Sequence, residues 1–307
     1  MSPETRESGI GPMVSDAGLP IGAVALGLFI NLLWGGNLVA VKLGFTAIPP
    51  LWSAFFRFAL GVSCLAVWAL LRRIRLWPFA TEWRPLLELS CVFSFQVAIM
   101  NWGVSFTAAG PAAVLQSTNP IFAALLAHFF IPGDQLTLRR ILGQMLAIAG
   151  VALTLLHQNP SVGSPAPLLG GVLLLGSGAL LGGRQVFSKT ILQRIETTKV
   201  VFWQMVFSLP LFAASGAVLE SLDLSRLTWT AAAAIGYQGI VIAGLGFMIS
   251  ASLIRQYRPS LVTSFNFTTP LFAVLLSVVL LGEPLTVWLV TGLVTVALGL
   301  IVITTGE

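Results

Sequence analysis

The sequence carries very little charge for its length. Asp, Glu, Lys and Arg make up 9% of the 307 residues, whereas hydrophobic residues make up 56% and the mean hydropathy is +0.93. A soluble globular domain has roughly a quarter charged residues. This shortage excludes an ordinary soluble domain. Repeated apolar runs of about 20 residues, the length that crosses a bilayer, indicate a polytopic helical membrane protein.

Cysteines and catalytic motifs are also scarce. The two cysteines, Cys64 and Cys91, fall inside apolar runs, so we expect neither a disulfide framework nor a metal site. The sequence has no Gly-x-x-x-x-Gly-Lys-Ser/Thr motif, which argues against ATP as the energy source. It has no catalytic cluster either, so we expect no enzyme and no cofactor. The pI of 9.9 arises from basic residues in short loops between apolar runs, so we expect no nucleic-acid partner.

Proline, glycine or charge interrupts the apolar sequence often enough to predict ten membrane-spanning helices. The predicted spans are 21–42, 51–71, 86–106, 110–131, 138–156, 168–189, 199–219, 229–254, 259–281 and 286–304. Residues 1–19 are polar and contain Pro, Gly and Ser, which predicts a disordered tail and not a signal peptide. An even number of spans places both termini on the same side of the membrane.

The distribution of basic residues predicts which side that is. With the N-terminus inside, the inner side holds Arg6, Arg72, Arg73, Arg75, Arg84, Arg139, Arg140, Lys189, Arg194, Lys199, Arg255 and Arg258, and the outer side holds only Lys42 and Arg226. Inner loops of membrane proteins carry an excess of Lys and Arg. Both termini are therefore predicted to be cytoplasmic.

One polar stretch within the apolar sequence occurs twice. Residues 116–126 (QSTNPIFAALL) and 266–276 (NFTTPLFAVLL) are identical at six of eleven positions. Each copy places an amide side chain, Gln116 or Asn266, four residues before a proline, Pro120 or Pro270. A helical proline leaves the carbonyl of residue i−4 unpaired, which is costly in hydrocarbon unless protein or a wet cavity satisfies it. We interpret the prolines as hinges beside a polar site; the alternative is a pair of kinks that relieve packing.

Further matches extend this repeat over the whole chain. Gly35-Gly36 matches Gly182-Gly183, and Gly143 and Gly150 match Gly292 and Gly299. Residues 20–156 and 168–304 thus form two related halves of five predicted spans each. Because five is odd, the second half must enter the membrane upside down. Such inverted repeats are common in secondary transporters, which bind substrate near the midplane between the repeats.

The segment Leu281-Gly282-Glu283-Pro284-Leu285-Thr286, followed by Gly292 and Gly299, resembles the end of an EamA domain of the drug/metabolite transporter superfamily. Trp34-Gly35-Gly36-Asn37 and Asn101-Trp102-Gly103 extend the resemblance to bacterial amino acid exporters, in particular the YddG type that exports aromatic amino acids. The resemblance implies a basket of ten helices, with spans 1, 3, 4, 6, 8 and 9 around a central cavity. One departure is Gly133-Asp134-Gln135, where the second half has Gly-Glu-Pro, so the two halves need not gate identically.

Amide and aromatic side chains inside spans are the candidate substrate ligands, because amides both donate and accept hydrogen bonds and suit a zwitterion. They are Gln116, Asn119, Asn266, Asn101, Trp102, Asn37, Trp34, Tyr237, Gln238 and Phe267. The alternative for these residues is close packing without a cavity. Arg57 and Arg184 are the arginines within spans; each either snorkels to its interface or pairs with a carboxylate.

These features predict a secondary transporter of the bacterial inner membrane that exports amino acids, aromatic or hydrophobic ones above all, and related small metabolites by alternating access. Its expected partners are the small-molecule substrate and the lipid bilayer, and the expected state is a monomer. One alternative is a multidrug or other metabolite carrier of the same superfamily. Another is an integral-membrane enzyme that processes lipids, which should show acidic or histidine clusters in its inner loops, where this chain has mostly arginine.

Overall fold

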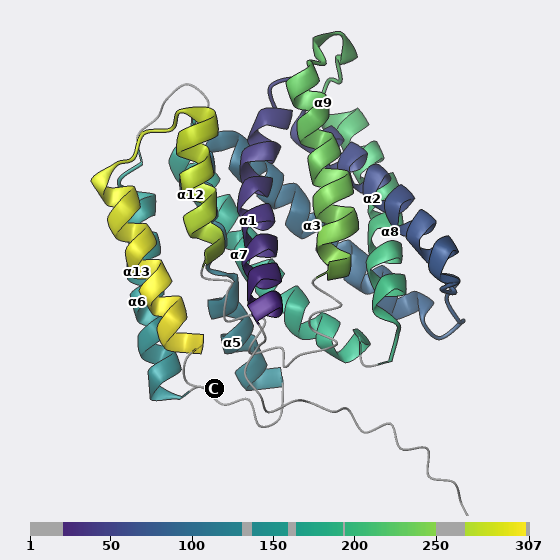
Figure 1. Cartoon of the computed structure of the whole chain (residues 1–307), viewed down its shortest axis with the longest axis horizontal. Helices are drawn as coiled ribbons and strands as arrows, with labels where there is room; N and C mark the ends of the chain where they lie inside the picture. The colour runs from purple at the N-terminus through teal and green to yellow at the C-terminus, as the bar shows by residue number, and fades with distance from the viewer. Residues whose placement is uncertain (1–20, 131–136, 159–163, 193, 250–267, 305–307) are drawn as a thin grey trace, which may run out of the picture.

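The computed structural model describes residues 21–130, 137–158, 164–192, 194–249 and 268–304. All regular elements of this part of the chain are helices (Figure 1). They are α1 (Ile21–Gly44), α2 (Pro50–Arg72), α3 (Trp83–Phe106), α4 (Ala109–Gln116), α5 (Asn119–Phe130), α6 (Leu138–Leu156), α7 (Pro167–Leu192), α8 (Thr197–Leu219), the short 3-10 helix η1 (Leu224–Arg226), α9 (Trp229–Gly236), the π-helix η2 (Tyr237–Gly246), α12 (Thr268–Leu281) and α13 (Val287–Thr304).

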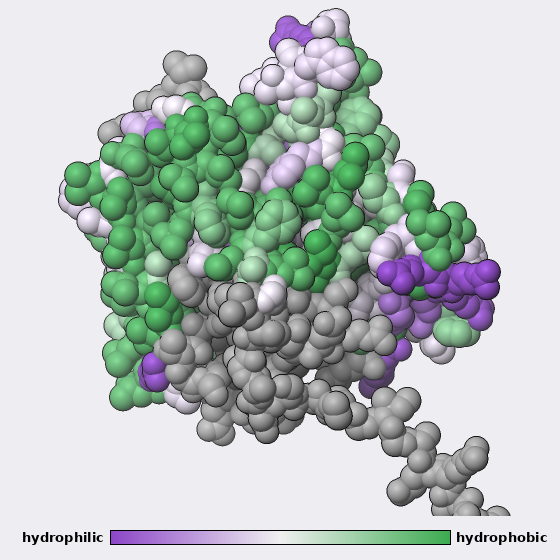
Figure 2. Space-filling model, viewed as in Figure 1, coloured by the Kyte–Doolittle hydropathy of each residue, from purple (hydrophilic) through white to green (hydrophobic). Residues whose placement is uncertain are grey.

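The lengths and compositions of these helices confirm the prediction of an all-helical membrane protein. Six helices are long and apolar enough to cross a bilayer, and shorter apolar helices accompany them within the described residues. Large apolar side chains such as Phe29, Val172 and Val279 are about half exposed or more on the outside of the bundle. Figure 2 shows this hydrophobic lateral surface over α1, α12 and α13, with hydrophilic residues gathered toward the ends of the helices. Lipid is the solvent for such a surface.

Glycines at matching repeat positions bring the two halves into contact. A Cβ on Gly35 of α1 would lie 2.8 Å from Cβ of Phe272 in α12, and a Cβ on Gly182 of α7 would lie 2.9 Å from Cβ of Phe122 in α5. The sequence repeat pairs Gly35 with Gly182 and Phe272 with Phe122. One close helix contact therefore recurs with the roles of the halves exchanged. Glycine is required at both positions because the helices approach too closely for a side chain.

The pairing of α6 with α13 follows the same rule. A Cβ on Gly150 would lie 2.6 Å from the carbonyl oxygen of Gly292, and a Cβ on Gly299 would lie 2.6 Å from the carbonyl oxygen of Gly143. In the repeat, Gly143 matches Gly292 and Gly150 matches Gly299. The contact of Gly150 with Gly292 therefore has the contact of Gly299 with Gly143 as its repeat equivalent. The glycine matches found in the sequence thus mark where the two copies pack.

Two predicted spans differ in the structure, and a third is described only in part. Span 110–131 was expected to be one kinked helix, but it is broken into α4 and α5 at Ser117 and Thr118. In span 229–254, α9 passes into the π-helix η2, a form that the sequence analysis did not predict, and residues 250–254 lie outside the described residues. The described part of span 259–281 begins at Thr268. The count of ten spans therefore remains a prediction.

Candidate functional site

The break between α4 and α5 lies at Ser117 and Thr118, within the predicted span 110–131. Pro120 cannot donate to the carbonyl of Gln116, and the side-chain Nδ2 of Asn119 donates to that carbonyl instead, at 3.1 Å. The hydroxyls of Ser117 and Thr118 donate to the carbonyls of Ala113 and Leu115 at 2.8 Å each. The freed carbonyl that the sequence predicted is therefore already paired, and one amide hydrogen of Asn119 is used to pair it.

The side chain of Gln116 extends toward α7, where the hydroxyl of buried Ser177 accepts from two amide side chains. Gln96 Nε2 donates to Ser177 Oγ at 2.9 Å, Gln116 Nε2 lies 3.4 Å from the same oxygen, and Ser177 Oγ donates to the Gln96 carbonyl at 3.2 Å. The Gln116 Oε1 atom is buried without a hydrogen-bond partner. This amide cluster of Gln96, Gln116 and Ser177 joins α3, α4 and α7, and it leaves one acceptor to bind a donor.

Four predicted ligands lie at the interface of α1 with η2 and its continuation. Tyr237 donates its hydroxyl to the Leu33 carbonyl at 2.7 Å, and Gln238 Nε2 donates to the Ala40 carbonyl at 3.0 Å. These two polar groups hold α1 in place. By contrast, Asn37 Oδ1 is buried without a partner, and the half-buried Trp34 ring meets Phe247 edge-on at 5.1 Å between centroids. Asn37 and Trp34 thus keep groups available for a ligand.

Asn101 and Trp102 form a separate cluster at the start of α2. Asn101 Nδ2 donates to the Pro50 carbonyl at 2.8 Å. Trp102 donates to the carboxylate of Glu220, which also accepts from the backbone N–H of Leu51 at 2.9 Å. Burial raises the pKa of the Glu220 carboxyl, and these hydrogen bonds lower it in part, so the pKa remains above its usual value. Both predicted ligands therefore contribute to the junction between α2, α3 and the end of α8.

The second copy of the polar stretch is described only from Thr268 onward. Asn266 and Phe267, both predicted ligands, lie outside the described residues. Pro270 is buried near the start of α12, and Pro120 occupies the matching place in α5. Thr269, which matches Asn119 in the repeat, hydrogen-bonds through its hydroxyl to Asn31 Oδ1 of α1. The start of α12 is thus polar and contacts α1, as the start of α5 contacts α7.

Charged groups lie at the helix ends. At one end of the bundle, Lys42 Nζ donates to the carbonyls of Val104 and Thr107 at the end of α3, at 2.9 and 2.6 Å. At the same junction, the Glu283 carboxylate accepts from the backbone N–H of Ala109 and Gly110, at 2.6 and 2.8 Å. A cation beside a helix C-terminus and an anion beside a helix N-terminus both stabilise the helix dipoles. These charges tie α1, α3, α4 and the α12–α13 loop together.

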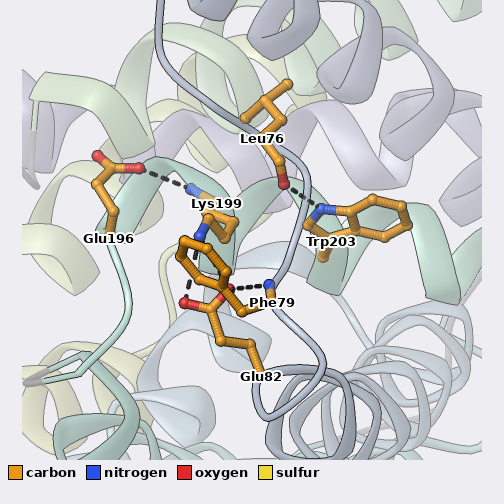
Figure 3. A network of polar contacts seen from close by, with 6 residues as sticks. All are labelled: Leu76, Phe79, Glu82, Glu196, Lys199 and Trp203. Carbon is orange, nitrogen blue, oxygen red and sulfur yellow. Dashed lines mark hydrogen bonds and ion pairs between the residues drawn. The ribbon is translucent and has the colours of Figure 1, made fainter.

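A second network closes the opposite end of α3. Lys199 Nζ lies 2.9 Å from Glu82 Oε2, and Trp203 Nε1 donates to the Leu76 carbonyl at 2.6 Å (Figure 3). Burial raises the pKa of the Glu82 carboxyl, but hydrogen bonds from Lys199 and from the Phe79 N–H, with the charges of Lys199 and Arg75, outweigh it and lower the pKa. This network fastens the α2–α3 loop to the start of α8.

The structure therefore separates the predicted ligands into three groups. Gln116 and Asn119 belong to the helix break, Trp34, Asn37, Tyr237 and Gln238 to the α1–η2 interface, and Asn101 and Trp102 to the start of α2. Sequence reasoning missed Ser177, because a serine between Gly176 and Gly178 does not stand out in an apolar span. Within the described residues, no group of three or more His, Cys, Asp or Glu side chains is arranged to hold a metal ion.

Two halves of apolar helices that contact each other at repeated glycines, with a polar break between α4 and α5, define a polytopic membrane protein of duplicated architecture. The family model described as the EamA-like transporter family matches the chain twice, at residues 21–156 and 168–305. The chain belongs to this family, which confirms the resemblance carried by the Leu281–Thr286 segment.

Curated relatives match the chain over nearly its full length. The "Uncharacterized transporter YvbV" of Bacillus subtilis is 26% identical over 284 residues, covering 90% of each chain. The "Probable amino-acid metabolite efflux pump" of Salmonella typhimurium is 27% identical over 285 residues, covering 90% of this chain and 92% of its own. A solved crystal structure with 18% sequence identity superimposes with a TM-score of 0.70, covering 92% of this chain and 98% of that one, which supports the fold.

Proposed function

We propose that the protein is a secondary transporter of the bacterial inner membrane that exports hydrophobic or aromatic amino acids and related small metabolites. The observation that carries the proposal is the helix break at residues 117–118. It lies about nine residues, or roughly 13 Å at 1.5 Å per residue, from the start of α4, near the middle of a hydrocarbon core of about 30 Å. Discontinuous helices at the midplane are where many secondary transporters bind substrate.

Groups at the break and at the α1–η2 interface together suit an amino acid. The unpartnered Gln116 Oε1 can accept from an ammonium group, and Asn37 offers a second unpartnered acceptor on α1. The ring of Trp34 offers an apolar surface for the substrate side chain. We propose that the two halves are inverted five-helix repeats around a central cavity, with the repeated glycine contacts as the surfaces on which they rock during alternating access. The names of two relatives, the "Probable amino-acid metabolite efflux pump" of Salmonella typhimurium and the "Uncharacterized inner membrane transporter YedA" of Escherichia coli, agree with this assignment.

Counterflow in liposomes tests the proposal. Purified protein would be reconstituted with an unlabelled amino acid inside, and the uptake of labelled phenylalanine, leucine, threonine and glutamate measured without any imposed gradient. Phenylalanine and leucine should exchange faster than glutamate. If no amino acid exchanges while cationic dyes do, the multidrug alternative within the same superfamily replaces the proposal.

A further inference from the structure

Arg184 is a half-buried cation with a buried Nε atom, and no acidic side chain among the described residues balances its charge. It lies on α7, where its guanidinium packs 5.1 Å from the centre of the Phe93 ring and Nη1 lies 3.4 Å from Gln204 Oε1. Its Nε atom is buried without a hydrogen-bond partner. Both neighbours are neutral, so neither compensates for the charge.

In the part of the chain that the structure describes, no carboxylate pairs with Arg184. The sequence contains no Asp or Glu from residue 89 to 133 or from 135 to 195. Glu88, on the same helix as Phe93, is paired with Arg84 at 2.8 Å and its side chain is 47% exposed. Arginine does not lose its proton in proteins, and a buried charge without a partner is strongly unfavourable. An anion from outside the chain would remove this cost.

A groove of about 320 Å³ lies beside Arg184, and its walls are apolar. The residues around it are Val92, Leu126, Ala179, Leu180, Gly183, Arg184 and Phe187. A volume of this size is at the lower end of the range for small-molecule sites. Phe187 also borders a second, larger pocket, which reaches Glu82, Glu88 and Arg194 at the ends of α3 and α7. The groove therefore neighbours a second pocket at the polar end of the bundle.

The groove opens to the outside of the bundle, where its wall residues Leu180 and Gly183 are half-buried, and the same side of α7 carries exposed apolar side chains toward the other end of the helix. Leu169, Val172, Leu180 and Gly183 follow one another at helical spacings that place them on one side of the helix. Leu169 and Val172 are 50% and 56% exposed on the outside of the bundle. A ligand can therefore reach the groove from the bilayer or along its surface, which favours an apolar molecule over a strongly hydrated one.

We propose that this groove binds a small amphiphilic carboxylate, with its apolar body between α3, α5 and α7 and its carboxylate on Arg184. The planar guanidinium matches a carboxylate in two-point geometry, and the side chains around the groove match an apolar body. The choice of a hydrophobic amino or organic acid as the carboxylate rests on the proposed function, and it makes the groove an entry site for the substrate that is separate from the helix break.

Three ligands that share a phenyl ring test the proposal. Labelled 3-phenylpropionate carries only a carboxylate, phenethylamine only an ammonium group, and L-phenylalanine both. Binding would be measured by scintillation proximity on purified protein in nanodiscs of phosphatidylcholine. We expect 3-phenylpropionate to bind, Arg184→Gln to weaken it tenfold or more, equivalent to 1.4 kcal/mol, and Arg184→Lys to weaken it less. Gly183→Leu, which fills the groove and keeps the charge, should also weaken binding, since a Cβ there already lies 3.3 Å from Leu126 Cδ1.

The matched control is Arg72→Gln, which removes an exposed arginine at the end of α2 and should leave binding unchanged. Equal affinities of the wild-type, Arg184→Gln and Gly183→Leu proteins for 3-phenylpropionate would overturn the proposal. So would phenethylamine binding as tightly as 3-phenylpropionate, or binding of phosphatidylglycerol in place of 3-phenylpropionate. If no amino acid is transported but Arg184-dependent binding of 3-phenylpropionate is observed, the proposed function fails and the groove assignment stands.

Discussion

The side-chain Nδ2 of Asn119 lies 3.1 Å from the main-chain carbonyl of Gln116 and donates to it. Pro120, the next residue, has no backbone N–H to donate to this carbonyl. The Asn119 side-chain amide donates in its place. A break in a membrane helix persists only if the protein or water pairs the freed groups. Asn119 therefore stabilises the gap between α4 and α5 that the proposed substrate site requires.

A double-mutant cycle tests this role of Asn119. Asn119→Ala should destabilise the protein by about 1–3 kcal/mol, the range for leaving a buried polar group unsatisfied. Pro120→Ala supplies an N–H that can pair with the Gln116 carbonyl, so Asn119→Ala should cost less in that background. Thermal unfolding of the four purified proteins in one detergent measures both costs. Equal costs in the two backgrounds would show that Asn119 does not act on this carbonyl.

The sequence predicted the helical class and the place of the break, but not its form. Pro120 predicts an irregular helix, because proline has no backbone N–H to donate. Whether the helix kinks or breaks depends on the Ser117 and Thr118 hydroxyls, which bond backward to carbonyls of the preceding turn. Such side-chain bonds offer the backbone an alternative to the regular helix, and the residue types alone do not determine whether the chain adopts it.

The candidate site was harder to predict than the fold. Periodicity shows that Gln96 and Gln116 lie in spans, but their meeting at Ser177 depends on how α3, α4 and α7 pack. The prediction also named Gln238, an amide within a span, as a substrate ligand. Gln238 instead bonds to the Ala40 carbonyl, which holds α1 against the π-helix. An amide satisfied by a neighbouring backbone has the same sequence signature as one that faces a substrate.

The Glu82–Lys199 ion pair should make stability depend on pH in acid. A carboxyl group whose pKa is lowered by folding contributes stability above its unfolded value, about 4.3 for Glu, and loses it as the pH falls through the lowered value. The unfolding temperature of the wild-type protein should therefore drop more steeply below about pH 4.3 than that of Glu82→Gln. Differential scanning fluorimetry across pH 3 to 7 in buffers of constant ionic strength measures the difference.

Glu88→Gln is the control for this pH series. Glu88 pairs with Arg84 on the surface, with side-chain exposures of 47% and 89%, and exposed pairs contribute little to stability. The Glu88→Gln profile should follow the wild-type profile. If Glu82→Gln follows it as well, the network at the start of α8 does not depend on the charge of Glu82.

Cysteine labelling tests the predicted orientation. Thr81 and Ser225 are both exposed, in the loop before α3 and in η1. In a background with Cys64 and Cys91 replaced by serine, a membrane-impermeant maleimide applied to intact cells should label Ser225→Cys and spare Thr81→Cys. Permeabilised cells, in which both should react, control for reactivity. Labelling of Thr81→Cys alone from outside would reverse the topology.

Gln116 provides the most direct test of the proposed substrate site. Its Oε1 is buried without a partner, and its Nε2 makes a long hydrogen bond of 3.4 Å to Ser177 Oγ. Gln116→Leu should therefore remove a bond to substrate while costing the fold little, because leucine is well tolerated in a span. A hydrogen bond of about 0.5–1.5 kcal/mol, or more to a charged group, corresponds to a three- to tenfold or larger loss of apparent affinity.

The control for Gln116→Leu is Gln144→Leu, since Gln144 is also a buried amide with an unpartnered nitrogen but lies on α6, away from the break. Counterflow of labelled phenylalanine, measured on monodisperse protein over a range of concentrations, should give a raised half-saturation concentration for Gln116→Leu and an unchanged one for Gln144→Leu. Unchanged kinetics in both variants would mean that the amide cluster of Gln96, Gln116 and Ser177 only packs helices, because a ligand that used the Gln116 acceptor could not bind as well without it.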